Sequence, residues 1–285
     1  MRSGRRRLPL AWVATLPFFA YTILFLFIPA GEVLVGGLKS KSGAWTFENV
    51  RLLFHHPYSD AYKTSIEVSL VTALIGALGG VLIAYAAIRE GTPRWVRSAF
   101  TTFSGVAANF GGIPLAFAFI ATLGTIGIAT KFMNNQLHLH VWSGADLFTK
   151  TGVEIVYLYF QFPLMILVIA PAIDGLRREW REAAANLGAK PWQFWWHVGI
   201  PVLMPSLLGA IILLFGNAFA AYATAYSLTA GALNIVPVMI GYYYNGNVLD
   251  NPHLAQAMAL GMFFVLAVMM LIYIPLQRRA ARWAK

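Results

Sequence analysis

Residues of the types that catalyse reactions or bind metals are present in this chain, but few of them are spaced as a catalytic site or a metal site requires. The chain has no cysteine, which excludes disulfides, iron–sulfur clusters and thiol chemistry. His138 and His140 stand two residues apart in HLH with no cysteine or acidic pair nearby, so we interpret them as loop residues and expect no metal site. The sequence also lacks an H-E-x-x-H motif, an Asp pair within its apolar segments and a G-x-x-x-x-G-K-[ST] phosphate loop. We therefore predict that this chain is not an enzyme, binds no cofactor and does not itself hydrolyse ATP.

One charged segment, WREAAANLGAKPWQFWWHVGIP (Trp180 to Pro201), has a spacing with structural meaning. Residues 182–187 favour a helix, and Gly188 is a typical end for it because glycine adopts the left-handed conformation cheaply. Pro191 is typical of the first residue of a second helix, where its missing N–H would be unpaired in any case. Pro201 then marks the start of an apolar segment. The spacing predicts two short helices at an angle to each other.

The aromatic residues of this segment allow another interpretation. Trp192, Trp195 and Trp196 lie at positions i, i+3 and i+4, so they are expected on one helix face. Tryptophan is common at membrane–water interfaces, and an amphipathic loop lying at the lipid headgroups would show the same residues. The residue types alone do not distinguish these interpretations.

A second group combines polar residues with helix-breaking residues inside an apolar segment. SGVAANFGGIPLAF places Asn109, Gly111, Gly112 and Pro114 about a dozen residues after Arg97. Proline removes a backbone hydrogen bond and paired glycines loosen a helix. In lipid, such breaks persist where protein or a water-filled cavity surrounds them, and they recur at transporter substrate sites. The segment is a candidate for a substrate pathway, and an ordinary proline kink is the alternative.

Four further polar residues lie within apolar segments and are candidates for the same pathway: Gln161, Asn217, Tyr222 and Tyr226. Hydrogen bonds between packed helices are the alternative for each of them. Glu32, Glu67 and Glu154 lie near the ends of apolar segments, where a charge costs less, so we expect them to have structural roles.

The composition of the chain predicts that membrane-spanning helices position these groups. Of the 285 residues, 59% are hydrophobic and only 11% are charged, against about 25% charged residues in a typical globular protein. The apolar residues form six blocks long enough to cross a bilayer as helices. We predict an all-α, polytopic membrane protein whose spans cover about residues 10–37, 62–88, 99–127, 153–173, 202–229 and 254–276. The first block is too long for a typical signal peptide, so we expect it to be retained.

The basic residues predict the orientation of the spans. Lys and Arg are enriched in cytoplasmic segments, and an N-terminus inside the cell places 15 of the 21 basic residues there. These residues are Arg2, Arg5, Arg6, Arg7, Arg89, Arg94, Arg97, Arg177, Arg178, Arg181, Lys190, Arg278, Arg279, Arg282 and Lys285. The net charge of +10 is thus a topology signal, and we expect no nucleic acid partner. We predict that both termini are cytoplasmic, with basic tails at 1–9 and 277–285 around a single six-span transmembrane domain at 10–276.

The charged segment resembles the cytoplasmic signature loop of ABC importer permeases, the membrane subunits of binding-protein-dependent uptake systems. The family pattern is Glu-Ala-Ala, three residues, Gly, nine residues, then two apolar residues one apart and Pro. It is matched here by Glu182, Ala183, Ala184, Gly188, Val198, Ile200 and Pro201. Val198 and Ile200 are conservative departures from the usual Ile and Leu. The resemblance covers about residues 60–276.

The resemblance implies a type I ABC importer permease whose loop at 174–201 couples to a separate ATPase. In that family this loop is a helix that docks on an ATP- and Mg-binding ATPase dimer. Two permease chains, identical or paralogous, form the pathway, and an external binding protein delivers the cargo. The expected location is the bacterial cytoplasmic (inner) membrane. A stand-alone channel or ion-driven carrier is the alternative, but it would not need the spacing from Glu182 to Pro201.

The cargo is less constrained by the residues. The segment after the fifth span is similar to permeases of the spermidine/putrescine branch, which implies a polyamine cargo and polyamine transport as the process. Glu32, Glu67 and Asp250, with the tyrosines at 242–244, would be available to bind ammonium groups. Ferric iron, thiamine, phosphonate, a sulfate-type anion or another small polar solute are the alternatives within the family.

Overall fold

The computed structural model describes residues 10–88, 92–136, 138, 142–245 and 251–283, and these residues are overwhelmingly helical. Two of the residues discussed above, His140 and Asp250, lie outside the described residues, as do the basic residues at 1–9, Arg89 and Lys285. Six described helical stretches are long and apolar enough to cross a membrane, at Thr15–Gly36, Tyr58–Ile88, Gly112–Asn135, Lys150–Asp174, Pro191–Phe219 and His253–Arg279. The predicted all-helical fold with six spans is confirmed.

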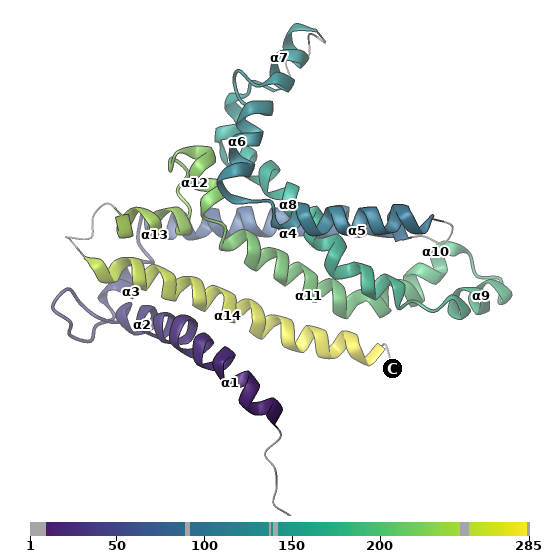
Figure 1. Cartoon of the computed structure of the whole chain (residues 1–285), viewed down its shortest axis with the longest axis horizontal. Helices are drawn as coiled ribbons and strands as arrows, with labels where there is room; N and C mark the ends of the chain where they lie inside the picture. Colours follow the sequence, from purple (N-terminus) through teal and green to yellow (C-terminus); the bar gives the residue numbers. More distant parts are fainter. Residues whose placement is uncertain (1–9, 89–91, 137, 139–141, 246–250, 284–285) are drawn as a thin grey trace, which may run out of the picture.

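The elements follow one another along the chain with short connections (Figure 1). They are α1 (Leu10–Thr22), η1 (Ile23–Phe27), α2 (Ile28–Gly36), α3 (Glu48–Leu52), α4 (Tyr58–Ile88), α5 (Arg94–Asn109), α6 (Gly112–Leu123), α7 (Ile128–Asn135), η2 (Ala145–Phe148), α8 (Lys150–Asp174), α9 (Arg178–Asn186), α10 (Pro191–Phe194), η3 (Trp195–Gly199), α11 (Ile200–Phe219), α12 (Ala223–Thr229), α13 (Val236–Asn245) and α14 (Pro252–Trp283).

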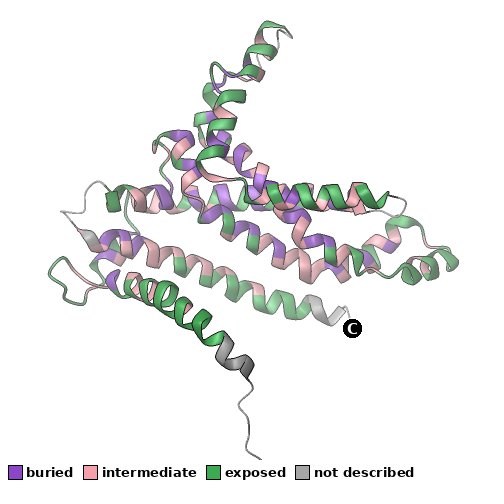
Figure 2. Ribbon diagram, in the orientation of Figure 1, coloured by how far each residue is buried: buried purple, intermediate pink, exposed green. Residues whose placement is uncertain are grey.

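The centre of the bundle is formed by α4, α8 and α11, which pack on one another along their lengths. Glycines on α4 allow α8 to approach closely, since a Cβ on Gly80 would lie 2.5 Å from Cβ of Met165. Buried residues concentrate in this centre, whereas the described part of α1 and the outer face of α14 are mostly exposed and α2 is partly exposed (Figure 2). Exposed apolar residues on spanning helices are the surfaces that meet lipid or other membrane subunits.

Ion pairs join the helices at both ends of the bundle. At one end, the Arg97 guanidinium at the start of α5 pairs with the Asp174 carboxylate at the end of α8. At the other end, Lys150 at the start of α8 pairs with Glu67 on α4, which agrees with the structural role predicted for Glu67. The described basic segments that were predicted to be cytoplasmic, at the starts of α5 and α9 and the end of α14, extend toward the same end of the molecule (Figure 1). We refer to this as the basic end.

The third span, predicted at about 99–127 with helix-breaking residues inside it, is interrupted there, and its membrane-spanning part lies later in the chain, at Gly112–Asn135. The helix breaks at Phe110 and Gly111, so that α5 packs along α8 while α6 packs against α12 and turns away from the bundle axis (Figure 1). Gly112 has a φ of 69°, a conformation that side chains with a Cβ rarely adopt. A proline and two glycines within five residues thus interrupt the helix instead of only bending it.

The fifth span is also displaced from the predicted 202–229. It begins eleven residues earlier, because the helix that starts at Pro191 continues through a π-helical turn at Trp195–Gly199 into α11 and ends at Phe219. The chain then breaks at Ala220–Tyr222 before α12. The expectation of two separate short helices around Gly188 is therefore wrong for the second one, which is the end of a membrane-spanning helix.

Candidate functional site

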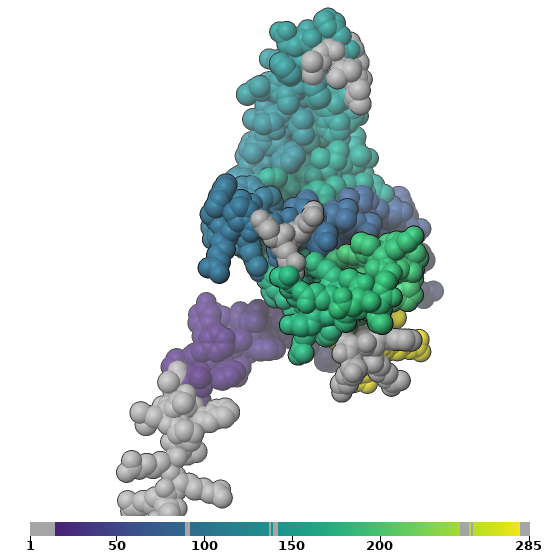
Figure 3. Space-filling model, turned by 90° about the vertical axis from the view of Figure 1, so that its right-hand side faces the viewer, coloured from purple at the N-terminus to yellow at the C-terminus, as the bar shows by residue number. Residues whose placement is uncertain are grey.

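The charged segment forms a sharp turn between α9 and α10 at the basic end of the bundle, which we call the elbow (residues 178–201). Figure 3 looks onto this end and shows the elbow, in green, standing toward the viewer beside the start of α5. Its first helix, α9, ends with a pair of backbone bonds: Ala189 N–H donates to Ala184 O and Gly188 N–H donates to Ala185 O, both at 2.9 Å. This is the Schellman arrangement, which requires a left-handed residue after the helix. Gly188 supplies it with a φ of 78°.

The second arm of the elbow begins at Pro191, as predicted from the sequence. The backbone N–H of Lys190 donates to Oε1 of Gln193 at 2.7 Å, which satisfies one of the donors left unpaired at a helix start. Both ends of the turn between the arms are thus fixed by local hydrogen bonds, so the turn is a rigid unit.

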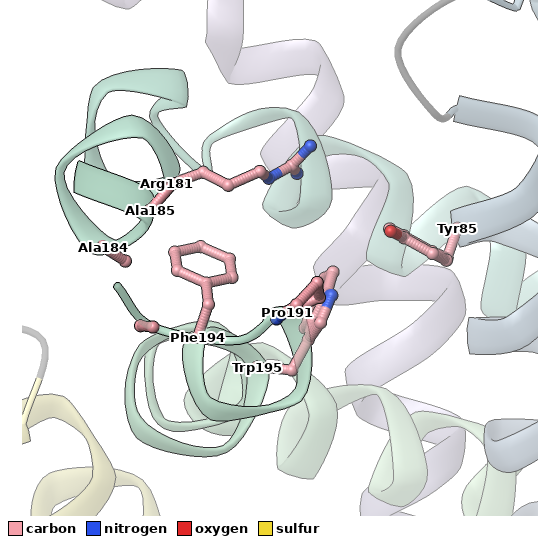
Figure 4. Close-up of a pocket in the computed structure, with 8 residues that line it drawn as sticks. Tyr85, Arg181, Ala184, Ala185, Pro191, Phe194 and Trp195 are labelled. Atoms are coloured by element: carbon pink, nitrogen blue, oxygen red, sulfur yellow. The ribbon is translucent and has the colours of Figure 1, made fainter. Parts of the chain in front are cut away.

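Two aromatic contacts that the sequence did not indicate hold the elbow in place, one to the bundle and one between its two arms. The Trp195 ring meets the Tyr85 ring of α4 edge to face, with centroids 4.9 Å apart. The Arg181 guanidinium lies 5.8 Å from the centre of the Phe194 ring, within the range of a cation–π contact. Figure 4 shows these side chains around a hollow of about 340 Å³ between the two arms. No sequence signal connects Tyr85 with Trp195, because they are 110 positions apart.

Trp195 also corrects the prediction that three tryptophans share one face. Trp192 and Trp196 are 62% and 68% exposed, whereas Trp195 turns inward against Tyr85. The π-helical turn that begins at Trp195 alters the register of the following residues relative to a regular α-helix.

The seven residues of the family pattern occupy two different places. Glu182, Ala183 and Gly188 lie exposed on the outer side of the elbow, and Ala184 borders the hollow. Glu182 accepts a hydrogen bond from Nε of Arg178 one turn earlier, at 2.7 Å. Val198, Ile200 and Pro201 are partly buried at the root of the second arm. The first group is thus accessible to another protein, and the second group joins the elbow to the bundle.

A second candidate region is a cavity of about 300 Å³ where the two broken spans meet, which we call the inner cavity. Five of the eight residues predicted for a pathway line it, namely Asn109, Gly111, Gly112, Asn217 and Tyr222. The described lining also includes Phe160, Ala220, Ala221 and Thr224, and none of the lining residues is charged. The inner cavity therefore combines side-chain amide and hydroxyl groups with backbone groups at two helix breaks, where the regular hydrogen bonds of a helix are interrupted.

Hydrogen bonds tie the two helix breaks to each other and to α8. The backbone N–H of Gly112 donates to Oγ1 of Thr224 at 2.8 Å, and Oη of Tyr157 donates to the carbonyl of Ala221 at 2.7 Å. A backbone group freed inside a membrane needs such a partner, because lipid offers none. The breaks are thus stable parts of the fold.

Three residues predicted for the pathway lie elsewhere. Pro114 is exposed in the first turn of α6. Gln161 is fully buried between helices and donates from Nε2 to the carbonyl of Leu214 at 3.0 Å, so the packing alternative describes its position. Tyr226 stacks on Tyr222 and borders a separate cavity.

The six spans, the elbow at one end and the broken helices in the middle together describe the membrane-spanning subunit of a transporter. Residues 76–284 match the model of the family described as binding-protein-dependent transport system inner membrane component. This chain belongs to that family. It is thus a multi-pass transport permease subunit, in a family whose importers carry ATPase activity on separate subunits.

Similar proteins include the probable sulfate transport system permease protein cysT of Nephroselmis olivacea, which is 28% identical over 216 residues, covering 75% of this chain and 70% of the relative. The protein of the same description from Chlorokybus atmophyticus is 24% identical over 217 residues, covering 75% of this chain and 69% of the relative.

Solved structures support the same fold. A chain in a crystal structure of a bacterial ABC transporter involved in the import of the acidic polysaccharide alginate superposes with a TM-score of 0.71 at 18% identity, covering 97% of this chain and 96% of that one. A chain of the MetNI methionine ABC transporter in an inward-facing conformation gives a TM-score of 0.52 at 15% identity, covering 79% of this chain and 99% of that one.

The relatives do not support the predicted resemblance to the spermidine/putrescine branch, because they are described as sulfate transport permeases. The groups considered for binding ammonium also have other partners. Glu67 pairs with Lys150, and the Tyr243 hydroxyl is 2.8 Å from that of Tyr58. The polyamine assignment rested on the resemblance of the segment after the fifth span, and the presence of acidic and aromatic residues in the sequence does not show whether they serve binding or packing.

Proposed function

We propose that this chain forms one wall of the pathway in an ATP-driven importer and that the elbow is its contact with the ATPase. The observation that carries the proposal is the construction of α9. This helix extends beyond the packed helices of the bundle (Figure 1), exposes Glu182 and Ala183, and ends in a turn fixed by local hydrogen bonds. A contact that transmits motion from a soluble partner needs small side chains for close approach and a rigid turn behind them.

The complete importer in this proposal has the composition expected from the family. Two permease chains, identical or paralogous, enclose the pathway, two ATPases bind ATP and Mg, and an external binding protein supplies the cargo in a bacterial cytoplasmic membrane. The solved relatives support this general composition, since one is described in complex with an alginate-bound periplasmic protein. The permease domain extends over about 10–276, with the coupling loop at 174–201 and basic cytoplasmic tails.

The inner cavity is the part of the pathway contributed by this chain. It lies near the middle of α8, beside Phe160, and its amide and hydroxyl groups give a passing solute hydrogen bonds without a charged binding group. A conducting site has to bind its solute weakly enough to release it. An uncharged cavity meets that requirement for a charged solute, which a strong ion pair would retain.

We infer that the cargo is a small oxyanion of the sulfate type. The names of the relatives support this class, and so does the uncharged lining. A polyamine would be expected to meet carboxylates, and the described lining has none. Side-chain amides, hydroxyls and backbone N–H groups are suitable donors to the oxygens of sulfate.

The absence of cysteine from the chain makes the ATPase contact directly testable. A single cysteine introduced as Ala183→Cys, on the exposed side of α9, is expected to form a cross-link to a single cysteine in the docking groove of the ATPase in the complete transporter. Ala172→Cys, on α8 within the bundle, is the matched control and is expected to form none. Equal cross-linking of the two variants would contradict the coupling role of the elbow.

The cargo is tested separately. Cells lacking their own sulfate uptake are expected to accumulate labelled sulfate when they express the complete transporter, and excess molybdate or thiosulfate is expected to compete more strongly than putrescine. Competition by putrescine but not by oxyanions would overturn the assignment of the cargo without affecting that of the ATPase contact.

A further inference from the structure

A second cavity lies between α12 and α13. It has a volume of about 400 Å³ and we call it the outer cavity. Its lining includes Tyr226, Gly231, Tyr242 and Asn245, and the described residues around it are uncharged. It therefore offers the same kinds of group as the inner cavity, namely phenolic hydroxyls and an amide.

The two cavities lie at different depths in the bundle. The helix α13, which borders the outer cavity, is joined to the first residue of α4 by the hydroxyls of Tyr243 and Tyr58, 2.8 Å apart. The start of α4 lies at the end of the bundle opposite the elbow (Figure 1). The inner cavity adjoins Phe160, near the middle of α8. A solute that enters from the end opposite the elbow would thus meet the outer cavity first.

Tyr222 lines both cavities. Its ring stacks on the Tyr226 ring with centroids 5.4 Å apart. On another side it lies against the bare Cα of Gly241, where an added Cβ would come within 2.6 Å of ring atom Cε2 and 2.9 Å of Oη. Gly241 on α13 thus leaves room for the Tyr222 ring on one side, and the Tyr226 ring on α12 packs against it on another.

We propose that the outer cavity is a second station on the pathway and that the Tyr222 ring is the partition between the two stations. The proposal rests on the proposed function in so far as the inner cavity is taken to be part of the pathway. Cargo passes when the ring leaves its place on Gly241. Because Tyr222 precedes α12 at the break that follows α11, a displacement of either helix moves the ring.

The test uses accessibility of cysteines and needs no knowledge of the cargo. Ala220→Cys places a thiol at the inner cavity and Asn245→Cys places one at the outer cavity, each in a chain with no other cysteine. In the complete transporter, a membrane-impermeant maleimide added outside is expected to label residue 245 readily and residue 220 slowly. Tyr222→Ala is expected to raise the labelling rate at residue 220 several-fold and to leave the rate at residue 245 unchanged.

Conservative and matched variants make the test specific to the ring. Tyr222→Phe keeps the ring and is expected to keep slow labelling at residue 220. Gly241→Ala is expected to displace the ring and to give fast labelling, even if Tyr222→Ala does not assemble. Gly216→Ala, whose Cβ would meet only Leu266 at an ordinary 3.8 Å, is the control and is expected to have no effect.

Unchanged labelling at residue 220 in Gly241→Ala, or equal acceleration in Tyr222→Phe, would overturn the partition. Equal acceleration at residues 220 and 245 would also overturn it, because that result indicates general loosening. Labelling of the expected pattern in a transporter that does not accumulate sulfate would retain the partition and reject only the cargo.

Discussion

The elbow and the inner cavity are built in opposite ways. The elbow is formed by 24 consecutive residues, and its turn is fixed by hydrogen bonds between neighbours in the sequence, such as that from Ala189 N–H to Ala184 O. The inner cavity is formed by residues from five helices, and the bond that joins its two breaks connects Gly112 with Thr224, 112 positions apart. The elbow is therefore expected to tolerate changes in the bundle, whereas the cavity depends on the packing of the whole bundle.

The largest effect is expected at the turn of the elbow. Gly188→Val places a β-branched residue at a φ of 78°, where even an unbranched side chain costs about 1–2 kcal/mol. We expect the chain to insert and assemble, but stimulation of ATP hydrolysis by the binding protein and uptake of cargo to be lost.

The matched variant is Gly188→Asn, since asparagine tolerates the left-handed conformation. A Cβ at this position meets no atom within 4 Å, so Asn is expected to retain uptake. Loss of uptake in both variants would show that the side chain, and not the backbone conformation, is responsible.

A smaller effect is expected where the two breaks are tied together. Thr224→Val removes the acceptor for the Gly112 N–H, and a hydrogen bond of this kind contributes about 0.5–1.5 kcal/mol. We expect a lower melting temperature of the purified transporter and slower uptake, with Thr224→Ser restoring both. Equal melting temperatures and equal rates of uptake for Thr224→Val and Thr224→Ser would indicate that the two breaks keep their geometry without the bond.

A comparison of two side-chain amides distinguishes a role in the inner cavity from a role in helix packing. Asn217→Leu removes an amide from the inner cavity, and we expect a several-fold rise in the KM for uptake with little change in melting temperature. Gln161→Leu removes a buried amide whose Oε1 has no hydrogen-bond partner among the described residues, so the lost bond is offset by removal of an unsatisfied group. We expect its KM to be unchanged, and a rise equal to that of Asn217→Leu would place Gln161 on the pathway.

The smallest effect on stability is expected at Glu182. Its ion pair with Arg178 is exposed, and pairs of this spacing contribute about 0.3–0.5 kcal/mol. Glu182→Gln is expected to leave the melting temperature nearly unchanged but to weaken cross-linking between Ala183→Cys and the ATPase groove. Undiminished cross-linking would show that the charge serves only α9 itself.

The same contrast explains what was predictable from the sequence. The six spans, the helix end at Gly188 and the helix start at Pro191 follow from periodicity and turn residues, which act locally. The glycines and proline at 111–114 indicated a break in the third span, and the structure has one. The break at Ala220–Tyr222 was not predicted, because no proline or glycine marks it and its carbonyl is satisfied by Tyr157 from α8.

Residues of the same type also lie in different environments in the structure, and packing between helices determines which environment each one has. Asn217 lines the inner cavity while Gln161 is buried between helices, although both are single amides in apolar segments. Trp195 turns toward Tyr85 while its neighbour Trp196 is exposed. In each pair, the decisive partner lies on another helix and has no counterpart in the local spacing.

The helix that begins in the elbow at Pro191 runs unbroken to Phe219 and ends beside the inner cavity at Ala220. At 1.5 Å per residue its 29 residues extend over about 43 Å. It is thus a single rod with one end at the proposed ATPase contact and the other next to the Tyr222 ring. Pro201 and Pro205 remove backbone donors in its first half, so bending should be confined there, and a push on the elbow would reach the far end as a shift of the whole second half.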